Sequence, residues 1–141
     1  MLACDGDAYV LGCRLRVEVE ITSTGQWLWA EYDDMTIESE VNNYTLHVTG
    51  YHGNAGDAFN DDHHERGRSN GMPFGTLDVE NDQKPNGNCA VVAGCGWWYK
   101  SCSRSLLNCE ARWFSKPRPT GTKSDGISVS TSRMLLRCGA G

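Results

Sequence analysis

Three acidic residues alternate in the segment LDVENDQ, and their spacing is suited to a divalent cation. Asp78, Glu80 and Asp82 occupy every second position there. Ca²⁺ takes about six to eight oxygen ligands from carboxylates, carbonyls and waters in a flexible loop. An EF-hand is excluded, because its sixth position would be Gln83 instead of Gly and its twelfth Cys89 instead of Glu. The alternative is an acidic turn whose Asp and Asn side chains bond their own backbone without an ion.

Seven cysteines form a second group of reactive side chains. This count is high for a cytosolic protein of 141 residues, and no two cysteines have the C-x-x-C spacing of a zinc site. Disulfides in an oxidising, extracellular setting are the better interpretation. Because the number is odd, at least one cysteine is a free thiol, is bonded to another chain, or has lost its partner with sequence that is absent here. No histidine base is placed to activate a cysteine as a nucleophile.

Other polar segments predict no catalysis. The run from Asp61 to Glu65 contains metal-capable side chains, but five consecutive residues cannot all converge, and the H-x-x-x-H spacing is missing. A solvated loop is therefore favoured over a metal site. The sequence contains no G-x-S-x-G, phosphate loop or spaced catalytic triad. We predict no enzymatic activity.

Composition and charge narrow the range of partners. The length of 141 residues predicts one domain. The net charge of -5, without a basic run, argues against binding to nucleic acid.

No stretch approaches the roughly 20 apolar residues that span a bilayer, so membrane insertion is not predicted. The opening MLACDGDAYV is too acidic and short for a secretory signal. The sequon at Asn43 predicts N-glycosylation, which is consistent with secretion.

Alternating apolar residues predict a set of antiparallel strands around these polar segments. Residues 14–21 read RLRVEVEI and predict a half-buried strand. The turn TSTGQ joins this strand to WLWAEY at residues 27–32, which favours a hairpin. A third strand is predicted at residues 44–51. The residues expected on the apolar faces of the first and third strands are Leu15, Val17, Val19, Ile21, Tyr44, Leu46 and Val48.

The remainder of the chain has little regular periodicity. Residues 53–75 predict a long loop rich in Gly, Asn, Asp and His. Residues 76–114 combine aromatics and cysteines with hardly any helical period. Residues 115–132 are rich in Ser, Thr, Lys, Pro and Gly, and the sequence then predicts a short apolar strand, MLLRC, at residues 134–138.

Several ordered segments of the chain carry a family resemblance. The run YTLHVTGYHGNAGD looks like the hallmark strand and GNAGD loop of the fibrinogen C-terminal (fibrinogen-like) domain family, and WAEYDDMTIESE resembles the strands that precede them. That family includes ficolins, tachylectins, angiopoietins and tenascins. NGMPFGTLDVENDQ followed by NCA resembles its calcium loop, and GWWYKSC followed by LN resembles its disulfide-bounded segment. The resemblance places the domain at residues 14–138, with residues 1–13 and 139–141 as tails.

The resemblance implies an α+β fold with a mainly antiparallel twisted sheet, few short helices and a long loop-rich recognition region stabilised by a disulfide and calcium. Family members usually carry an additional N-terminal subdomain with its own disulfide. No segment here resembles that subdomain, so we expect a truncated or diverged copy.

The resemblance also assigns the calcium ligands and one disulfide. Glu80 and Asp82 would supply side-chain oxygens to Ca²⁺, with Asp78 nearby and backbone carbonyls completing the shell. Cys89 would pair with Cys102. Cys95 and Cys109 stand where family members commonly have glycine, so they form a second bridge or remain free thiols. No partner is evident for three further cysteines, and bonding between chains would fit the homo-oligomers of the family: Cys4, Cys13 and Cys138.

Lectin-like family members bind acetyl groups in an aromatic-lined pocket beside this disulfide, near a cis peptide that would join Ser101 to Cys102. The residues implied to bind ligand are Trp98, Tyr99, Ser101, Cys102 and Ser103. The lectin-like pattern has His where this chain has Ser103, and the Gly-x-Tyr after LN is replaced by Cys109, Glu110 and Ala111. The bulk of the GWWY aromatics favours burial in the core over a stacking role.

The resemblance predicts a secreted lectin-like module that recognises acetylated or other surface glycans in innate defence. Calcium would support the site, and no covalent chemistry is involved. The alternative is a protein-binding module, such as a signalling ligand, matrix component or coagulation-type protein, whose altered pocket no longer binds sugar. Ser103 and the missing Gly-x-Tyr favour this alternative. The expected partner is an acetylated glycan or a protein receptor.

Overall fold

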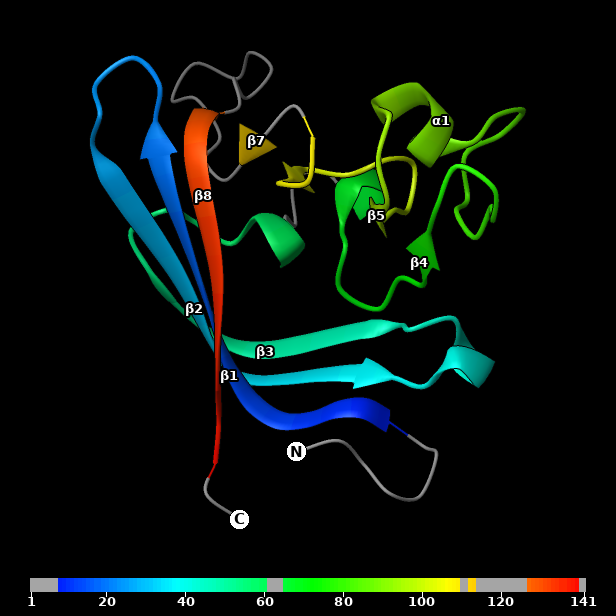
Figure 1. The fold of residues 1–141 in the computed structure, drawn as a ribbon, viewed down its shortest axis with the longest axis horizontal. Coiled ribbons are helices and arrows are strands. Elements are labelled where there is room, and N and C mark those ends of the chain that lie inside the picture. The colour runs from blue at the N-terminus through cyan, green and yellow to red at the C-terminus, as the bar shows by residue number, and fades with distance from the viewer. Residues whose placement is uncertain (1–7, 61–64, 110–111, 114–126, 140–141) are drawn as a thin grey trace.

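The central feature of the molecule is a twisted antiparallel sheet with strand order β3-β2-β1-β8-β7-β6, in which β6 (Ser105–Leu106) and β7 (Arg112–Trp113) are short (Figure 1). The computed structural model describes residues 8–60, 65–109, 112–113 and 127–139. Four long strands carry this sheet: β1 (Ala8–Ile21), β2 (Trp27–Glu38), β3 (Leu46–Gly53) and β8 (Ile127–Cys138). The mainly antiparallel α+β architecture that the sequence predicts is therefore present.

Strand β1 lies between β2 and β8, and its alternation separates a core face from a charged face. Leu15, Val17 and Val19 are almost completely buried on the core face. On the opposite face, Arg16 Nη1 donates to Glu31 Oε2 at 3.1 Å, and its guanidinium lies 4.6 Å from the Trp29 ring centroid. The predicted hairpin is thus confirmed, although β1 begins at Ala8 instead of residue 14 and contains register shifts before Leu15.

The third predicted strand begins two residues later than expected. Leu46 and Val48 are buried as predicted, but Tyr44 lies outside β3. Asn43 and Tyr44 have left-handed backbones with φ of 52° and 54°, which is incompatible with the extended conformation of a strand. This turn follows the 3-10 helix η1 (Glu40–Asn42).

Strand β8 corrects the prediction of a short strand at residues 134–138. It already begins at Ile127, so six residues assigned to the polar tail belong to the sheet; residues 115–126 lie outside the described part of the chain. Antiparallel pairing with β1 explains this, because Val19 faces Ser132 and Ile21 faces Val129. Backbone hydrogen bonds to β1 do not depend on side-chain type, so the polar residues of β8 can also pair with it.

Two apolar residues of β8 are less covered than their partners on β1. Leu136 pairs with Leu15, and Met134 pairs with Val17, so both lie on the core face. They are nevertheless 50% and 38% exposed. Sequence alone indicated an apolar strand here, and the structure shows that the strand lies at the margin of the core.

The region between β3 and β8 is loop-rich, as predicted, and its regular elements are short. The short elements are η2 (Ala58–Asn60), η3 (Glu65–Gly67), β4 (Phe74–Gly75), α1 (Cys89–Ala93), β5 (Trp97–Trp98), β6 (Ser105–Leu106) and β7 (Arg112–Trp113). No helix among the described residues has the length and apolar content to cross a membrane.

An aromatic cluster joins the loop-rich region to the sheet. The Phe59 ring lies 5.3 Å from the Tyr32 ring of β2 and 5.3 Å from the Trp113 ring of β7, centroid to centroid. It also stacks on Trp97 at 6.3 Å. All four side chains are almost completely buried. Burial of such large rings stabilises a region that has few backbone ladders of its own.

Replacement of Leu15 tests which face of β1 carries the core. We expect Leu15→Ala to lower the free energy of unfolding by about 2–5 kcal/mol, since it leaves a cavity in the packed face. The matched control is Leu135→Ala, because Leu135 pairs with Arg16 on the charged face and is 44% exposed. That change should stay within about 0.5 kcal/mol. Urea denaturation measures both, and equal losses would contradict the assignment of faces.

Candidate functional site

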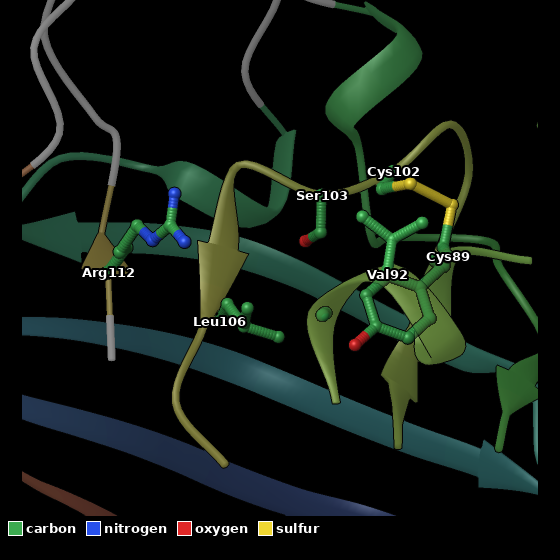
Figure 2. Close-up of a pocket in the computed structure, with 8 residues that line it drawn as sticks. Cys89, Val92, Cys102, Ser103, Leu106 and Arg112 are labelled. Atoms are coloured by element: carbon green, nitrogen blue, oxygen red, sulfur yellow. A yellow bond between two sulfur atoms is a disulfide. The ribbon is translucent and has the colours of Figure 1, made fainter. Parts of the chain in front are cut away.

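The best candidate for a binding site is a cavity of about 170 Å³ beside the Cys89–Cys102 disulfide. Figure 2 shows the disulfide and Val92 on one side and Leu106 and Arg112 on the other. The lining is mainly apolar, with a few polar groups at its edge. It consists of Cys89, Val92, Ala93, Tyr99, Cys102, Ser103, Leu106 and Arg112.

Helix α1 supplies one wall of this pocket, and its two ends are set by local sequence. The Asn88 side chain caps the first turn by accepting from the backbone N–H of Ala90 at 2.9 Å and of Val91 at 3.3 Å. Gly94 ends the helix with φ of 84°, a left-handed conformation that favours glycine. Between these two ends, Val92 lines the pocket, and its side chain is 72% exposed.

Residues 99–104 contribute Tyr99, Cys102 and Ser103 to the lining, and backbone hydrogen bonds hold this segment against residues 66–67. Ser101 N donates to the Arg66 carbonyl at 2.8 Å, and Arg104 N donates to the Gly67 carbonyl at 2.9 Å. A Cβ at Gly67 would overlap the Arg104 side chain, so only glycine permits this approach. The peptide between Ser101 and Cys102 is cis, as the family resemblance implies.

Three serine hydroxyls form a hydrogen-bonded network beneath the pocket. Ser69 Oγ lies 2.9 Å from Ser103 Oγ and 3.1 Å from Ser105 Oγ. Trp97 Nε1 donates to Ser105 Oγ at 3.2 Å, and Ser103 Oγ donates to the Ser105 carbonyl. The Ser103 hydroxyl is thus engaged toward the interior. Sequence reasoning missed Ser69 and Ser105, because only their complete burial distinguishes them from other serines.

Tyr99 connects this pocket to the acidic turn. Its side chain is almost completely buried, and its hydroxyl donates to the Cys95 carbonyl at 2.7 Å. Burial, and secondly the carboxylate of Asp82, raise the pKa of Tyr99 to about 12. The phenol therefore remains neutral at physiological pH, and its oxygen can accept a hydrogen bond from a ligand.

Trp98 and Ser101, although implied to bind ligand, do not line this pocket. Trp98 is 8% exposed, packs edge-on against Phe74 at 5.2 Å and donates its indole N–H to the Tyr44 carbonyl at 2.9 Å. It therefore belongs to the core, which agrees with the interpretation of GWWY as core aromatics. Ser101 lines a neighbouring cleft instead.

The disulfides account for six cysteines. Besides Cys89–Cys102, the structure contains the Cys95–Cys109 bond, which the sequence left as an alternative to free thiols. It also pairs Cys13 with Cys138, for which the sequence showed no evident partner and bonding between chains would have fitted the family resemblance. Register explains this bond, since the two residues face each other on β1 and β8. Cys4 lies outside the described residues, as do residues 61–64 of the predicted solvated loop.

The acidic turn places its three carboxylates in different surroundings. Asp82 is partly buried, and its two oxygens accept from the backbone N–H of Lys84 at 2.8 Å and of Cys89 at 2.9 Å. Asp78 is exposed and accepts from Thr76 Oγ1 at 2.8 Å. Glu80 is exposed and makes no hydrogen bond or ion pair to another described residue. Among all the residues that the structure describes, no three Asp, Glu, His or Cys side chains are grouped so that they could hold a metal ion.

Comparison with known proteins identifies the family. The sequence profile described as "Fibrinogen beta and gamma chains, C-terminal globular domain" matches residues 10–134. Human fibroleukin is 37% identical over 94 residues, which make up 67% of this chain and 21% of fibroleukin.

Two solved structures agree with this match. The fibrinogen-like globe domain of human ANGPTL2 has a TM-score of 0.70 and 32% identity, and the match covers 90% of this chain and 58% of that one. A lamprey fibrin D-dimer, complexed with the peptide Gly-His-Arg-Pro-amide, has a TM-score of 0.68 and 27% identity, with coverage of 92% and 47%.

Fold and site together define a disulfide-stabilised recognition module of a non-enzymatic class. The chain belongs to the family of fibrinogen C-terminal globular domains. It spans about a fifth of the length of human fibroleukin.

Removal of a hydroxyl from the serine network tests whether it supports the pocket. We expect Ser105→Ala to lower the free energy of unfolding by about 1–3 kcal/mol, because the buried indole N–H of Trp97 loses its acceptor. The matched control is Ser130→Ala, whose exposed hydroxyl donates to the Glu20 carbonyl at 3.3 Å. Chemical denaturation gives both values, and a neutral Ser105→Ala would show that the network is dispensable.

Proposed function

We propose that this domain is a secreted recognition module that binds a small acetylated group of a surface glycan in the pocket beside Cys89–Cys102. The observation that carries the proposal is a cavity of about 170 Å³ with mainly apolar walls, which is large enough to hold an acetyl group and gives its methyl an apolar lining. Extracellular ligands of this kind require binding only, and no bond is made or broken.

The lining supplies a separate contact for each part of an acetamido group. The methyl would contact Val92, Ala93 and Leu106, where burial of apolar surface is favourable. The Tyr99 oxygen would accept the amide N–H, and the Arg112 guanidinium would donate to the carbonyl oxygen. Ser103 contributes mainly to the wall, since its hydroxyl is engaged with Ser69 and Ser105.

Protein or peptide recognition in the same pocket is the second candidate. The lamprey fibrin D-dimer, whose structure is similar, was solved with a bound peptide. The inward engagement of Ser103, where lectin-like members have His, also favours this candidate. A role as a signalling, matrix or coagulation-type ligand would follow from it.

Secretion is supported by the three disulfide bonds, which persist in oxidising compartments. The predicted glycosylation site, Asn43, is exposed in the turn before β3, so its side chain is accessible for modification. Homo-oligomerisation, which would fit the family resemblance, would then occur outside the cell.

Two neighbouring valines on α1 provide a matched test of the acetyl pocket. Val92 lines the pocket and Val91 does not, yet both are exposed, at 72% and 56%. We expect Val92→Lys to weaken retention on N-acetylated sugar supports about tenfold or more, because the ammonium would lose hydration on ligand binding. Val91→Lys should be retained like the unchanged protein. Affinity chromatography on acetylated and non-acetylated supports gives the comparison.

The outcomes separate the two candidate functions. Acetyl-selective retention that Val92→Lys abolishes supports glycan recognition. Absence of retention by the folded, oxidised protein contradicts it and favours the peptide candidate. Binding of Gly-His-Arg-Pro-amide, measured by calorimetry and lost in Val92→Lys alone, would then support a peptide site.

We further propose that Ca²⁺ supports this site through the acidic turn, with Glu80 and Asp82 as its side-chain ligands and Asp78 nearby. Glu80 has no competing partner among the described residues, and each Asp82 oxygen keeps a lone pair beyond its backbone hydrogen bond. Because only one of these carboxylates is unengaged, backbone carbonyls and waters would have to complete the shell. The Asp82 carboxylate is also the second cause, after burial, of the raised pKa of Tyr99, which lines the pocket.

Calcium binding to the folded state should raise thermal stability. Ca²⁺ at about one hundred times its Kd adds about 2.7 kcal/mol by mass action, so the melting temperature should exceed that in chelator by several degrees. Glu80→Gln should remove this difference, and Glu40→Gln, an exposed acid on η1, should not. Identical melting curves of the unchanged protein in calcium and in chelator would contradict the proposal. Calorimetric scans provide the measurement.

A further inference from the structure

A second cleft, of about 210 Å³, lies at the residues that precede Cys102. It is lined by Arg66, Gln83, Pro85, Lys100 and Ser101. Cys102, the residue after Ser101, lines the acetyl pocket. Consecutive residues of one segment therefore line the two hollows.

Backbone hydrogen bonds fix the walls of this second cleft independently of any ligand. Ser101 N donates to the Arg66 carbonyl at 2.8 Å, and Gln83 N donates to the Lys100 carbonyl at 2.7 Å. Lys100 N in turn donates to the Cys102 carbonyl at 2.7 Å. Three segments that are distant in sequence are thus held together, and the cleft is preorganised.

Two cations line this cleft, and the described residues balance their charge only in part. The Lys100 side chain is 19% exposed, and its Nζ lies 3.2 Å from Oε1 of Glu65, whose side chain is 77% exposed. The Arg66 guanidinium is exposed and has no hydrogen bond or ion pair to any other described residue. A single Lys–Glu pair whose carboxylate is largely exposed contributes little to stability.

We infer that this cleft binds an oxyanion, a sulfate or a carboxylate, carried by the glycan whose acetyl group occupies the first pocket. Arg66 can offer two parallel N–H donors to such a group, and Lys100 supplies a partly desolvated positive charge. The exposed Gln83 amide provides a further donor at the rim. The oxyanion site stands on this cleft alone, whereas the choice of a glycan as its carrier rests on the proposed function. The ligand class is therefore an acidic, acetylated saccharide.

Inorganic sulfate tests the oxyanion site without any acetyl group. We expect sulfate, titrated against chloride at constant ionic strength, to shift the backbone amide NMR signals of residues 66, 83, 100 and 101. The double variant Arg66→Gln/Lys100→Gln should bind sulfate roughly tenfold more weakly, because it loses both charge-assisted contacts. The matched control is Arg137→Gln, an exposed cation on β8. Equal weakening by the control, or an unchanged affinity in the double variant, would overturn the inference.

A variant that strengthens binding separates recognition from damage to the fold. Glu65 competes with an oxyanion for the Lys100 ammonium. We expect Glu65→Gln to raise sulfate affinity a few-fold, because the competing carboxylate is removed. A loss of fold cannot produce this gain. Unchanged or weaker sulfate binding in a folded Glu65→Gln protein would overturn the assignment of Lys100.

Saccharides with one or both groups test the shared ligand. We compare a sugar bearing an N-acetyl group alone with the same sugar carrying an added sulfate or an added carboxylate. The acidic forms should bind roughly tenfold more tightly, and Arg66→Gln/Lys100→Gln should abolish only this gain. Sulfate binding that persists while acetyl binding fails would refute the glycan ligand but retain the oxyanion site. Acetyl binding without any acidic gain would refute the shared ligand and leave the proposed function intact.

Discussion

Both hollows in this domain depend on how the segment from Tyr99 to Arg104 is anchored. The Cys89–Cys102 disulfide ties the segment to α1, and backbone hydrogen bonds tie it to Arg66 and Gly67. Loops without such anchors lose conformational entropy when they bind, which weakens binding. Here folding already fixes the segment, so binding should lose less conformational entropy. The same anchored segment contributes lining residues to both the apolar pocket and the cationic cleft.

Large aromatic rings, more than regular structure, connect the recognition region to the sheet. Phe59 contacts Tyr32 from β2 and Trp113 from β7, and all three are almost completely buried. The Tyr32 hydroxyl donates to Asp57 at 2.6 Å, and burial together with this carboxylate raises the pKa of Tyr32. A loop-rich region can therefore be rigid where it matters for binding, because its rings are packed between strands that are held by long ladders.

Polar side chains replace backbone ladders where the loops approach the sheet. Asn70 pairs with Val48 of β3 like an adjoining strand: its Oδ1 accepts from the backbone N–H at 2.9 Å and its Nδ2 donates to the carbonyl at 3.0 Å. The serine network performs a similar role beneath the pocket. Among the described residues, no buried side-chain nitrogen or oxygen lacks a hydrogen-bond partner. This completeness matters, because an unpaired buried polar group is costly.

The sequence by itself determined the features that depend on local pattern or on specific family motifs. Alternation over Leu15, Val17 and Val19 predicted the central hairpin, because neighbouring side chains on a strand point to opposite faces. Motifs implied the family, the Cys89–Cys102 pair and the position of the pocket. Only tertiary structure decided the extent of β8, the Cys13–Cys138 bond, the serine network and the cleft formed by Arg66 and Lys100. Each of these joins residues that are distant in sequence, and such contacts leave no periodic signal in either segment.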